Sequence, residues 1–320
     1  MTVSVRQRYF KIPLFVYVLG AVLLGASVGK IWMPQWIDSA IYIALFLMLF
    51  PPMLEVNFTG VTRVFKEPRL VTVALLLNFL VSPLLIFGLL HLFVGAGEAP
   101  LMVGIILYGS VPGGGMAPAF TGMLKGNVSL TVTIAAIGSI LSLGIVPLWA
   151  KFLTGTQVQV PALLIFEHLC FIVVIPLALG VLTRRIVVWK KGESTFCSVK
   201  ERLKPLSNLG LFLILFAMSL LYGDRVLSDP YFVLKIAAPV AAFLTILFVI
   251  SGAIGKAFAA PYEDAIALTL STTAKNNAIS LALAFSTFGA DAGLVNAIAG
   301  PLVQLPILLA FVALRTGNKT

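Results

Sequence analysis

Charged residues are scarce in this sequence. Asp, Glu, Lys and Arg make up only 11% of the 320 residues, whereas 60% are hydrophobic and the mean hydropathy is +1.06. Soluble domains carry roughly a quarter charged residues, so the composition excludes an ordinary soluble protein. It predicts an all-α protein that crosses a membrane several times.

Cysteine and histidine are also rare. Cys170 lies in an apolar run and Cys197 in a polar one, which gives neither a disulfide framework nor a metal-binding spacing. The two histidines fall in different apolar runs, and the sequence has no "HExxH" or "GxSxG" pattern. An intramembrane hydrolase is therefore a remote alternative, and we expect no enzyme activity and no cofactor other than a coupling ion.

Long apolar runs dominate what is present. Windows of about 20 apolar residues, the length that spans a bilayer, give ten candidate spans: 13–32, 38–56, 70–94, 100–124, 127–150, 161–186, 205–222, 231–258, 262–289 and 291–314. The first to fifth spans correspond in order to the sixth to tenth. Because each half has an odd number of spans, the halves have opposite orientations, as in the inverted repeats of many transporters.

The basic residues predict how these spans are oriented. Seventeen Lys and Arg residues fall on the side of the N-terminus, three fall on the other side, and Lys235 and Lys275 lie within spans. Positive charge resists translocation, so both termini are expected in the cytoplasm and the protein in the cell (inner) membrane. The net charge of +10 is then explained by topology, and we expect no nucleic-acid partner.

These patterns divide the chain into three parts. Residues 1–186 hold the first repeat (spans one to five) and the start of the second, residues 187–204 form a cytoplasmic linking loop, and residues 205–320 complete the second repeat. We expect a single membrane domain in which two subdomains, a panel and a core, interleave along the chain. The basic, then apolar, N-terminal stretch also fits a signal peptide, but span 13–32 is needed to complete the repeat.

The fourth span is interrupted in its middle. Its sequence is "LMVGIILYGSVPGGGMAPAFTGMLKGN", with Pro112, Gly113, Gly114 and Gly115 near the middle. Proline has no backbone N–H to donate, and glycine has no side chain that would favour the helical conformation. The helix should open there, and free backbone groups persist in a membrane only where they face protein, water or a ligand. The alternative is an ordinary kinked packing helix.

The ninth span is the repeat partner of the fourth and is interrupted by polar residues in "STTAKNNAIS". These residues are Ser271, Thr272, Thr273, Lys275, Asn276 and Asn277. Two interrupted helices at equivalent positions should cross near the bilayer midplane and offer helix ends and free carbonyl groups to a solute. This pattern predicts a secondary transporter with alternating access, and a channel is the less favoured alternative.

The residues quoted so far resemble a known family, the bile acid:sodium symporter superfamily, which includes the arsenite-efflux permeases. The segment "VPGGGMAPAFTGMLKGNVSLTVTIAAIGSILSLGIVPL" is similar to the family's fourth and fifth spans. The segments "LFLMLFPPMLEVNF" and "GPLVQLPILLAFV" resemble the arsenite-efflux branch. The resemblance covers nearly the whole chain and implies ten spans in two inverted repeats with broken helices four and nine.

The resemblance also implies where coupling ions bind. The positions of one sodium site fall on Pro118, Ala119, Thr131, Ala135 and Thr272, of which only Thr131 keeps a side-chain oxygen of the matching kind. Those of a second site fall on Asn78 and Asn276, which retain amide oxygens. A residual sodium site there is one expectation. The cysteine of the arsenite branch is replaced by glycine or methionine.

Lys275 stands beside the second sodium position, where the family usually has an apolar residue. Burying a lysine at a span centre costs about 2.5–3.5 kcal/mol on insertion scales. We interpret its ammonium as a substitute for a coupling sodium, held by Asn276, Asn277, Asn78 and Gln304, and able to release its proton when desolvated. Two alternatives remain, a direct counter-ion for an anionic substrate and a lysine that only reaches a watery cleft.

The remaining expectations concern function. The substrate or ion site comprises Pro112, Gly113, Gly114, Gly115, Asn78, Thr131, Thr272, Thr273, Lys275, Asn276, Asn277 and Gln304. Glu167 and His168 are either a structural hydrogen-bonded pair or a protonatable gate. The predicted function is transport of a small, organic anion coupled to protons or sodium, and arsenite or antimonite efflux is the alternative. The expected partners are this substrate and membrane lipid, and the sequence is compatible with a monomer.

Overall fold

The protein is helical almost throughout. The computed structural model describes residues 11–54, 68–94, 99–154 and 162–317, and no strand occurs within these ranges. Five helices in the described part are long and apolar enough to cross a membrane: Pro68–Phe93, Val128–Leu153, Leu163–Ser228, Pro230–Ala257 and Ala290–Thr316. The prediction of an all-α membrane protein is confirmed.

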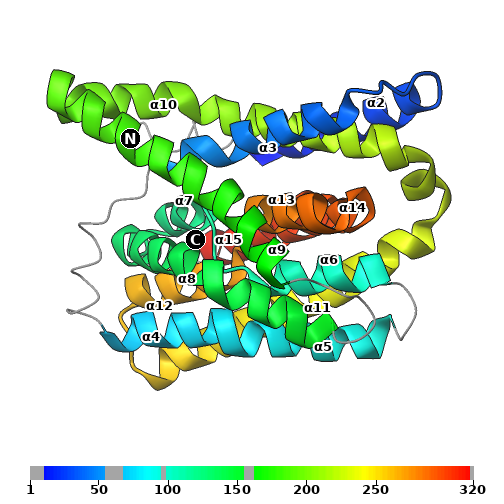
Figure 1. Ribbon diagram of the computed structural model, residues 1–320. Coiled ribbons are helices and arrows are strands. Elements are labelled where there is room, and N and C mark those ends of the chain that lie inside the picture. Colours follow the sequence, from blue (N-terminus) through cyan, green and yellow to red (C-terminus); the bar gives the residue numbers. More distant parts are fainter. Residues whose placement is uncertain (1–10, 55–67, 95–98, 155–161, 318–320) are drawn as a thin grey trace.

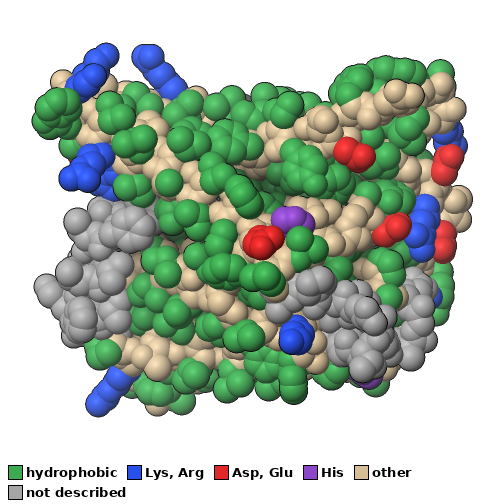
Figure 2. All heavy atoms as spheres, in the orientation of Figure 1, with side chains coloured by type: hydrophobic (Ala, Val, Ile, Leu, Met, Phe, Trp, Pro, Cys, Tyr) green, Lys and Arg blue, Asp and Glu red, His purple; other side chains and the backbone are tan. Residues whose placement is uncertain are grey.

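Hydrophobic side chains cover much of the outer surface. Figure 2 shows them over most of the face in view. Phe171 is 67% exposed and Leu148 is 65% exposed, which would be costly in water. The surface therefore matches a lipid environment, and the charged side chains in this view lie mainly toward its edges.

Three helices form one layer of the molecule, which we call the panel. They are α2 (Lys11–Gly29), α3 (Ile37–Met53) and α10 (Ile175–Ser228), drawn along the top of Figure 1. A Cβ atom at Gly29 would overlap the Leu220 carbonyl oxygen, and one at Gly210 would crowd the Ala44 carbonyl oxygen. Small residues thus allow these backbones to approach closely, as is common between helices in membranes.

The expected linking loop at 187–204 is wrong in its local structure. Residues 175–228 are helical on both sides of Gly192, where φ is 81° and ψ is 167°. This positive φ favours glycine, and it lets the chain reverse direction within one residue. The linking segment is therefore a helical hairpin, visible at the upper left of Figure 1.

The other long helices form a second layer, which we call the core. Its elements are α4 (Pro68–Leu76), η2 (Leu77–Val81), α5 (Ser82–Phe93), α6 (Ala99–Ser110), α7 (Met116–Met123), α8 (Val128–Thr154), α11 (Pro230–Ala257), α12 (Tyr262–Thr273), α13 (Asn277–Phe288), α14 (Ala290–Ile298), η5 (Ala299–Gln304) and α15 (Leu305–Gly317). Helix α9 (Ala162–Leu169) and η4 (Cys170–Val174) lead from the core into α10. The elements η2, η4 and η5 are π-helical turns.

The two predicted interruptions are present. Helix α6 ends at Ser110 and α7 begins at Met116, so the first break comprises residues 111–115. Helix α12 ends at Thr273 and α13 begins at Asn277, so the second break comprises residues 274–276. Five of the basic residues used to predict orientation, Arg6, Arg8, Arg63, Lys66 and Lys319, lie outside the described residues.

Candidate functional site

The two breaks meet and pair through their backbones. The Gly114 amide donates to the Ala274 carbonyl at 2.9 Å, and the Asn276 amide donates to the Pro112 carbonyl at 2.9 Å. These bonds form an isolated antiparallel bridge between Gly113 and Lys275. Free backbone groups in a membrane are expected to face protein, water or a ligand, and four of those in the breaks face protein. We call residues 111–115 and 274–276 together the crossing.

Glycine is required in the first break because the second break lies so close. A Cβ atom on Gly113 would overlap the carbonyl oxygen of Ser271, and one on Gly114 would overlap Asn276. Gly115 is exposed, and its added Cβ would lie 3.2 Å from the Pro52 side chain in α3. The glycine run thus allows close approach within the core at its first two positions and faces the panel at its third.

Lys275 is buried at the centre of the crossing, with only 1% of its surface exposed. Its Nζ donates a hydrogen bond to Oδ1 of Asn78 at 2.9 Å. The same nitrogen lies 5.7 Å from the centroid of the Phe243 ring, a distance compatible with a cation–π interaction. In the described part of the chain, no carboxylate forms an ion pair with Lys275. Its compensation therefore comes from one amide oxygen and one aromatic face.

Two further hydrogen bonds orient the Asn78 side chain that accepts the Lys275 ammonium. It lies in the π-helical turn η2, and its Nδ2 donates to the carbonyls of Ala74 at 3.0 Å and Ser271 at 3.1 Å. Both amide hydrogens are thereby used, which directs Oδ1 toward Lys275. The side chain thus joins α4, α12 and the second break.

Gln304 contacts the backbone of Lys275 and not its ammonium group. Its Nε2 donates to the Lys275 carbonyl at 3.1 Å, and its Oε1 accepts a hydrogen bond of 2.5 Å from the Tyr108 hydroxyl. Gln304 ends the π-helical turn η5. Lys275 is therefore bound by residues of two π-helical turns, a local geometry that recurs at functional sites.

Asn276 and Asn277 do not hold the ammonium group, contrary to expectation. Asn276 caps α13, where its Oδ1 accepts from the Ile279 amide at 3.3 Å. Asn277 packs against Gly300, and its Oδ1 is buried without a hydrogen-bond partner among the described residues. At the start of α13, the Asn276 side chain therefore caps the helix, whereas the Asn277 Oδ1 has no hydrogen bond within the described residues.

The predicted threonines form other contacts. The hydroxyls of Thr272 and Thr273 donate to backbone carbonyls of the preceding turn of α12, and the bond from Thr273 to the Thr269 carbonyl is 2.7 Å long. Thr131 pairs with the Thr121 hydroxyl at 3.1 Å and also bonds the Asn127 carbonyl. None of the three forms a hydrogen bond with Lys275, because the preceding helical turn satisfies each hydroxyl.

Glu167 and His168 do not pair with each other. The Nδ1 of His168 lies 2.9 Å from the Thr287 hydroxyl, which joins α9 to α13. Glu167 is exposed. The structural-pair interpretation is therefore wrong for these two side chains, because His168 has Thr287 as its partner.

The residues that retain family sodium positions do not fit a sodium ion here. Oδ1 of Asn78 accepts from an ammonium group, and Oδ1 of Asn276 accepts from a helix amide. A hard cation such as sodium requires several oxygen ligands, and at both of these amide oxygens an N–H donor already takes up a coordination position. Among the described residues at this point of the crossing, the positive group in place is the ammonium of Lys275.

Three residues that support the crossing were not predicted from the sequence: Tyr108, Phe243 and Asn296. Tyr108 and Phe243 were hidden in apolar runs, where aromatic residues usually only pack. Asn296 accepts from Ser280 at 2.7 Å and donates to the Gly104 carbonyl at 3.0 Å, which ties α14 to α13 and α6. A single amide in an apolar span was the signal for Asn296, because such groups rarely remain unpaired in a membrane.

Comparisons with known proteins agree with this architecture. Arsenical-resistance protein Acr3 of Alkaliphilus metalliredigens is 25% identical, and the match covers 98% of this chain and 93% of that protein. Acr3 of Corynebacterium glutamicum is 27% identical over 90% of this chain and 80% of its own length. The probable sodium/metabolite cotransporter BASS2 of Oryza sativa is 30% identical over 50% of this chain and 39% of its own length. The model of the Sodium Bile acid symporter family matches residues 42–229, more than half of the sequence, so this chain belongs to that family.

Proposed function

We propose that this protein is a secondary transporter, not an enzyme, and that it moves a small organic anion through the crossing by alternating access. Membership of a transporter family supports the transport function. One observation supports the choice of an anionic substrate: the ammonium of Lys275 is buried between two broken helices, and no carboxylate of the described residues pairs with it. An anion that enters the crossing would gain from this positive charge.

We further propose that Lys275 takes the place of a coupling sodium ion. Its ammonium occupies the Asn78 oxygen at which the family resemblance implies a cation ligand. A lysine is covalently attached and cannot be transported, so it supplies the charge without requiring sodium. Coupling, where present, would then involve a proton taken up or released by a desolvated group of the site.

The finer architecture belongs to the same proposal. It comprises ten spans in two inverted repeats, with both termini in the cytoplasm of a cell membrane. Helices at each candidate range and breaks at the predicted positions support the spans. In each half of the chain, helices of the panel (α2 and α3, then α10) precede most helices of the core. The proposed substrate and ion residues are those of the crossing together with Asn78, Asn277 and Gln304, and His168 is the proposed gating residue.

A panel of substrates in proteoliposomes tests the proposal. Uptake and counterflow of short carboxylates and of arsenite would be measured with and without sodium, at two pH values. We expect saturable uptake of at least one organic anion that persists when choline replaces sodium. A strict sodium requirement would overturn the role given to Lys275, and unsaturable flux without counterflow would overturn the carrier mechanism.

Arsenite efflux is the second candidate function. It is supported by the two relatives called arsenical-resistance proteins, which match 98% and 90% of this chain. The absence of a cysteine from both breaks counts against it. Expression in an arsenite-sensitive strain separates the candidates: restored growth on arsenite would replace the organic-anion proposal, and continued sensitivity with membrane-inserted protein would favour it.

A further inference from the structure

The hairpin of α10 concentrates positive charge beyond the apolar parts of the molecule. We define the basic hairpin as residues 184–204, which carry these basic residues: Arg184, Arg185, Lys190, Lys191, Lys200, Arg202 and Lys204. Only two acidic residues, Glu193 and Glu201, accompany them. Figure 2 shows Lys and Arg side chains at the upper left, where Figure 1 places the turn of α10. Basic residues thus outnumber acidic residues by seven to two in the basic hairpin.

One of these cations stabilises the hairpin itself. Arg184 pairs with Glu193 at 3.2 Å across the turn, and its guanidinium lies 5.4 Å from the centroid of the Phe196 ring. Phe196 is buried. These contacts join the two arms of the hairpin close to its turn.

Other basic residues of the hairpin remain available for a ligand. Arg185, Lys190, Lys191, Arg202 and Lys204 are exposed and form no ion pair with any residue that the structure describes. Neighbouring charges of one sign repel each other. A surface of this kind gains free energy when an anionic partner approaches.

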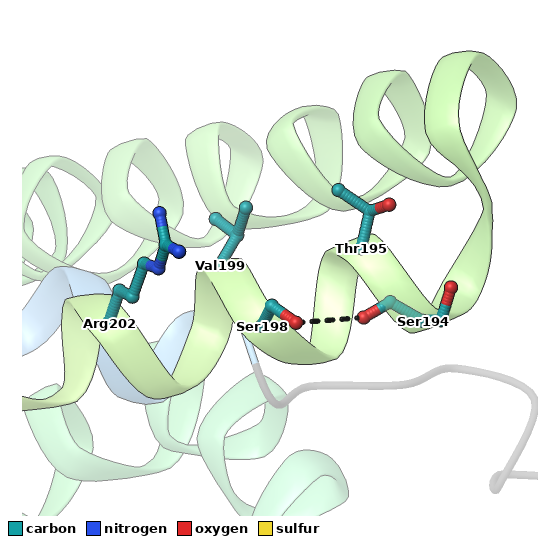
Figure 3. Close-up of a pocket in the computed structure, with 5 residues that line it drawn as sticks. All are labelled: Ser194, Thr195, Ser198, Val199 and Arg202. Atoms are coloured by element: carbon teal, nitrogen blue, oxygen red, sulfur yellow. Dashed lines mark hydrogen bonds between the residues drawn. The ribbon is translucent and has the colours of Figure 1, made fainter.

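A shallow hollow on the basic hairpin holds one of its cations beside polar side chains. Figure 3 shows it lined by Ser194, Thr195, Ser198, Val199 and Arg202, with the Arg202 guanidinium on the same side of the helix as Thr195. The hydroxyls of Ser198 and Thr195 donate to the carbonyls of Ser194 at 3.2 Å and Lys191 at 2.9 Å, so the donor in the hollow that faces outward is the Arg202 guanidinium. A guanidinium group is a typical donor to phosphate oxygens.

The position of the hairpin selects the kind of anion. Residues 163–228 include the apolar segments that lead into and out of it, so its charges lie next to the bilayer surface. Trp189 is 81% exposed and precedes Lys190 and Lys191. An exposed tryptophan beside basic residues is typical of the membrane–water interface.

We propose that the basic hairpin binds the phosphate headgroups of anionic phospholipids, with the Arg202 guanidinium donating to one phosphate. Clusters of four to eight basic residues beside a membrane span attract such lipids, at about a fivefold gain in binding per charge. The lipid fixes the hairpin against the membrane surface. This inference does not depend on the substrate of the crossing.

Lipid binding to the purified full chain tests the proposal. The protein would be titrated with phosphatidylglycerol or phosphatidylcholine in mixed detergent micelles, and bound lipid measured by native mass spectrometry. The variants are Arg202→Gln and the double variant Lys190→Gln/Lys191→Gln. Lys151→Gln is the matched control, because Lys151 is a basic residue exposed at the end of α8, away from the hairpin.

We expect phosphatidylglycerol to bind more tightly than phosphatidylcholine, and each hairpin charge removed to weaken its binding by about fivefold. The control should retain wild-type binding. Inorganic phosphate at the same concentration should not compete, because it lacks the apolar chains. Equal binding of both lipids, equal loss in the control, or full competition by inorganic phosphate would each overturn the proposal.

A hydrogen-exchange measurement in bilayers covers the case in which a variant folds poorly. Wild-type protein in nanodiscs of pure phosphatidylcholine would be compared with nanodiscs that contain phosphatidylglycerol. The proposal predicts slower exchange of residues 186–204 in the anionic nanodiscs. Unchanged exchange there, or protection only after an acidic protein or RNA is added, would contradict it.

Discussion

The Nζ atom of Lys275 lies 2.9 Å from Oδ1 of Asn78, although 197 residues separate them in the sequence. The ammonium comes from the break between α12 and α13, and its acceptor comes from a π-helical turn after α4. This contact places a charge deep inside the core, and no carboxylate in the part of the chain that the structure describes forms an ion pair with it. Three of the predictions below concern this contact and the crossing around it.

Replacement of Lys275 tests its role in transport. Lys275→Met keeps the length of the side chain and removes the ammonium, so we expect loss of anion uptake in proteoliposomes. The control is Lys235→Met, because Lys235 lies over the Tyr231 ring at 4.8 Å and outside the crossing. Undiminished uptake by Lys275→Met and Lys275→Ala would remove both functional interpretations of this lysine.

Replacement of Asn78 tests the pairing itself. Asn78→Leu leaves the Lys275 ammonium without its amide partner, and we expect a loss of about 1.5–3 kcal/mol of stability, as for hydrogen bonds to charged groups. In the double variant with Lys275→Met, the part of this loss that comes from the unpaired ammonium should disappear because no buried charge remains, whereas the loss of the bonds to Ala74 and Ser271 should stay. Thermal unfolding in detergent measures each of the four proteins. Additive losses in the double variant would show that the two side chains are not coupled.

The close approach of the breaks predicts a strict requirement for glycine. Gly114→Ala introduces a Cβ into the space of Asn276, so we expect both a lower unfolding temperature and a loss of transport. Gly144→Ala is the matched control, since no atom lies within 4 Å of the added carbon. That variant should keep its activity and gain slightly in helix stability. Equal behaviour of both variants would disprove the steric argument.

Tyr108→Phe should destabilise the protein through Gln304. The change removes the donor to Oε1 of Gln304 and leaves a buried acceptor unsatisfied, at a cost of about 1–3 kcal/mol. Tyr42→Phe provides the control, because Tyr42 contributes its ring to Phe285 and has no hydroxyl bond among the described residues. Thermal unfolding of both variants decides the matter, and similar unfolding temperatures would contradict the prediction.

The bond between His168 and Thr287 predicts an effect on transport rate. Thr287→Val keeps the shape and removes the oxygen that joins α9 to α13, so we expect faster exchange between access states and a higher initial rate of uptake. Glu167→Gln should change this rate little, because the side chain is exposed. An unaltered rate in Thr287→Val would exclude gating by this bond.

The sequence was sufficient for the features that depend on local chemistry. Proline and glycine predicted the break before Met116, and clustered polar residues predicted the break before Asn277, because both disturb a helix whatever surrounds it. The partners of Lys275 were predicted only in part. Among four amide candidates, the sequence could not show that Gln304 binds a backbone carbonyl while Asn78 accepts the ammonium, since that depends on how the helices pack.

The same limit explains the other differences. The polar composition of 187–204 suggested a loop, but Lys, Glu and Arg are good helix formers, and one glycine suffices for the reversal. Tyr108 was missed because its hydroxyl finds a partner 196 residues away. Contacts of this range leave no periodicity in the sequence.

Two backbone hydrogen bonds tie Gly114 to Ala274 and Asn276 to Pro112. They have a mechanical consequence, because a movement of one broken helix relative to the other has to break these bonds. Under the proposed transport mechanism, we therefore expect the two broken helices to move as one unit. The change of access would then take place between core and panel, where Gly115 faces Pro52.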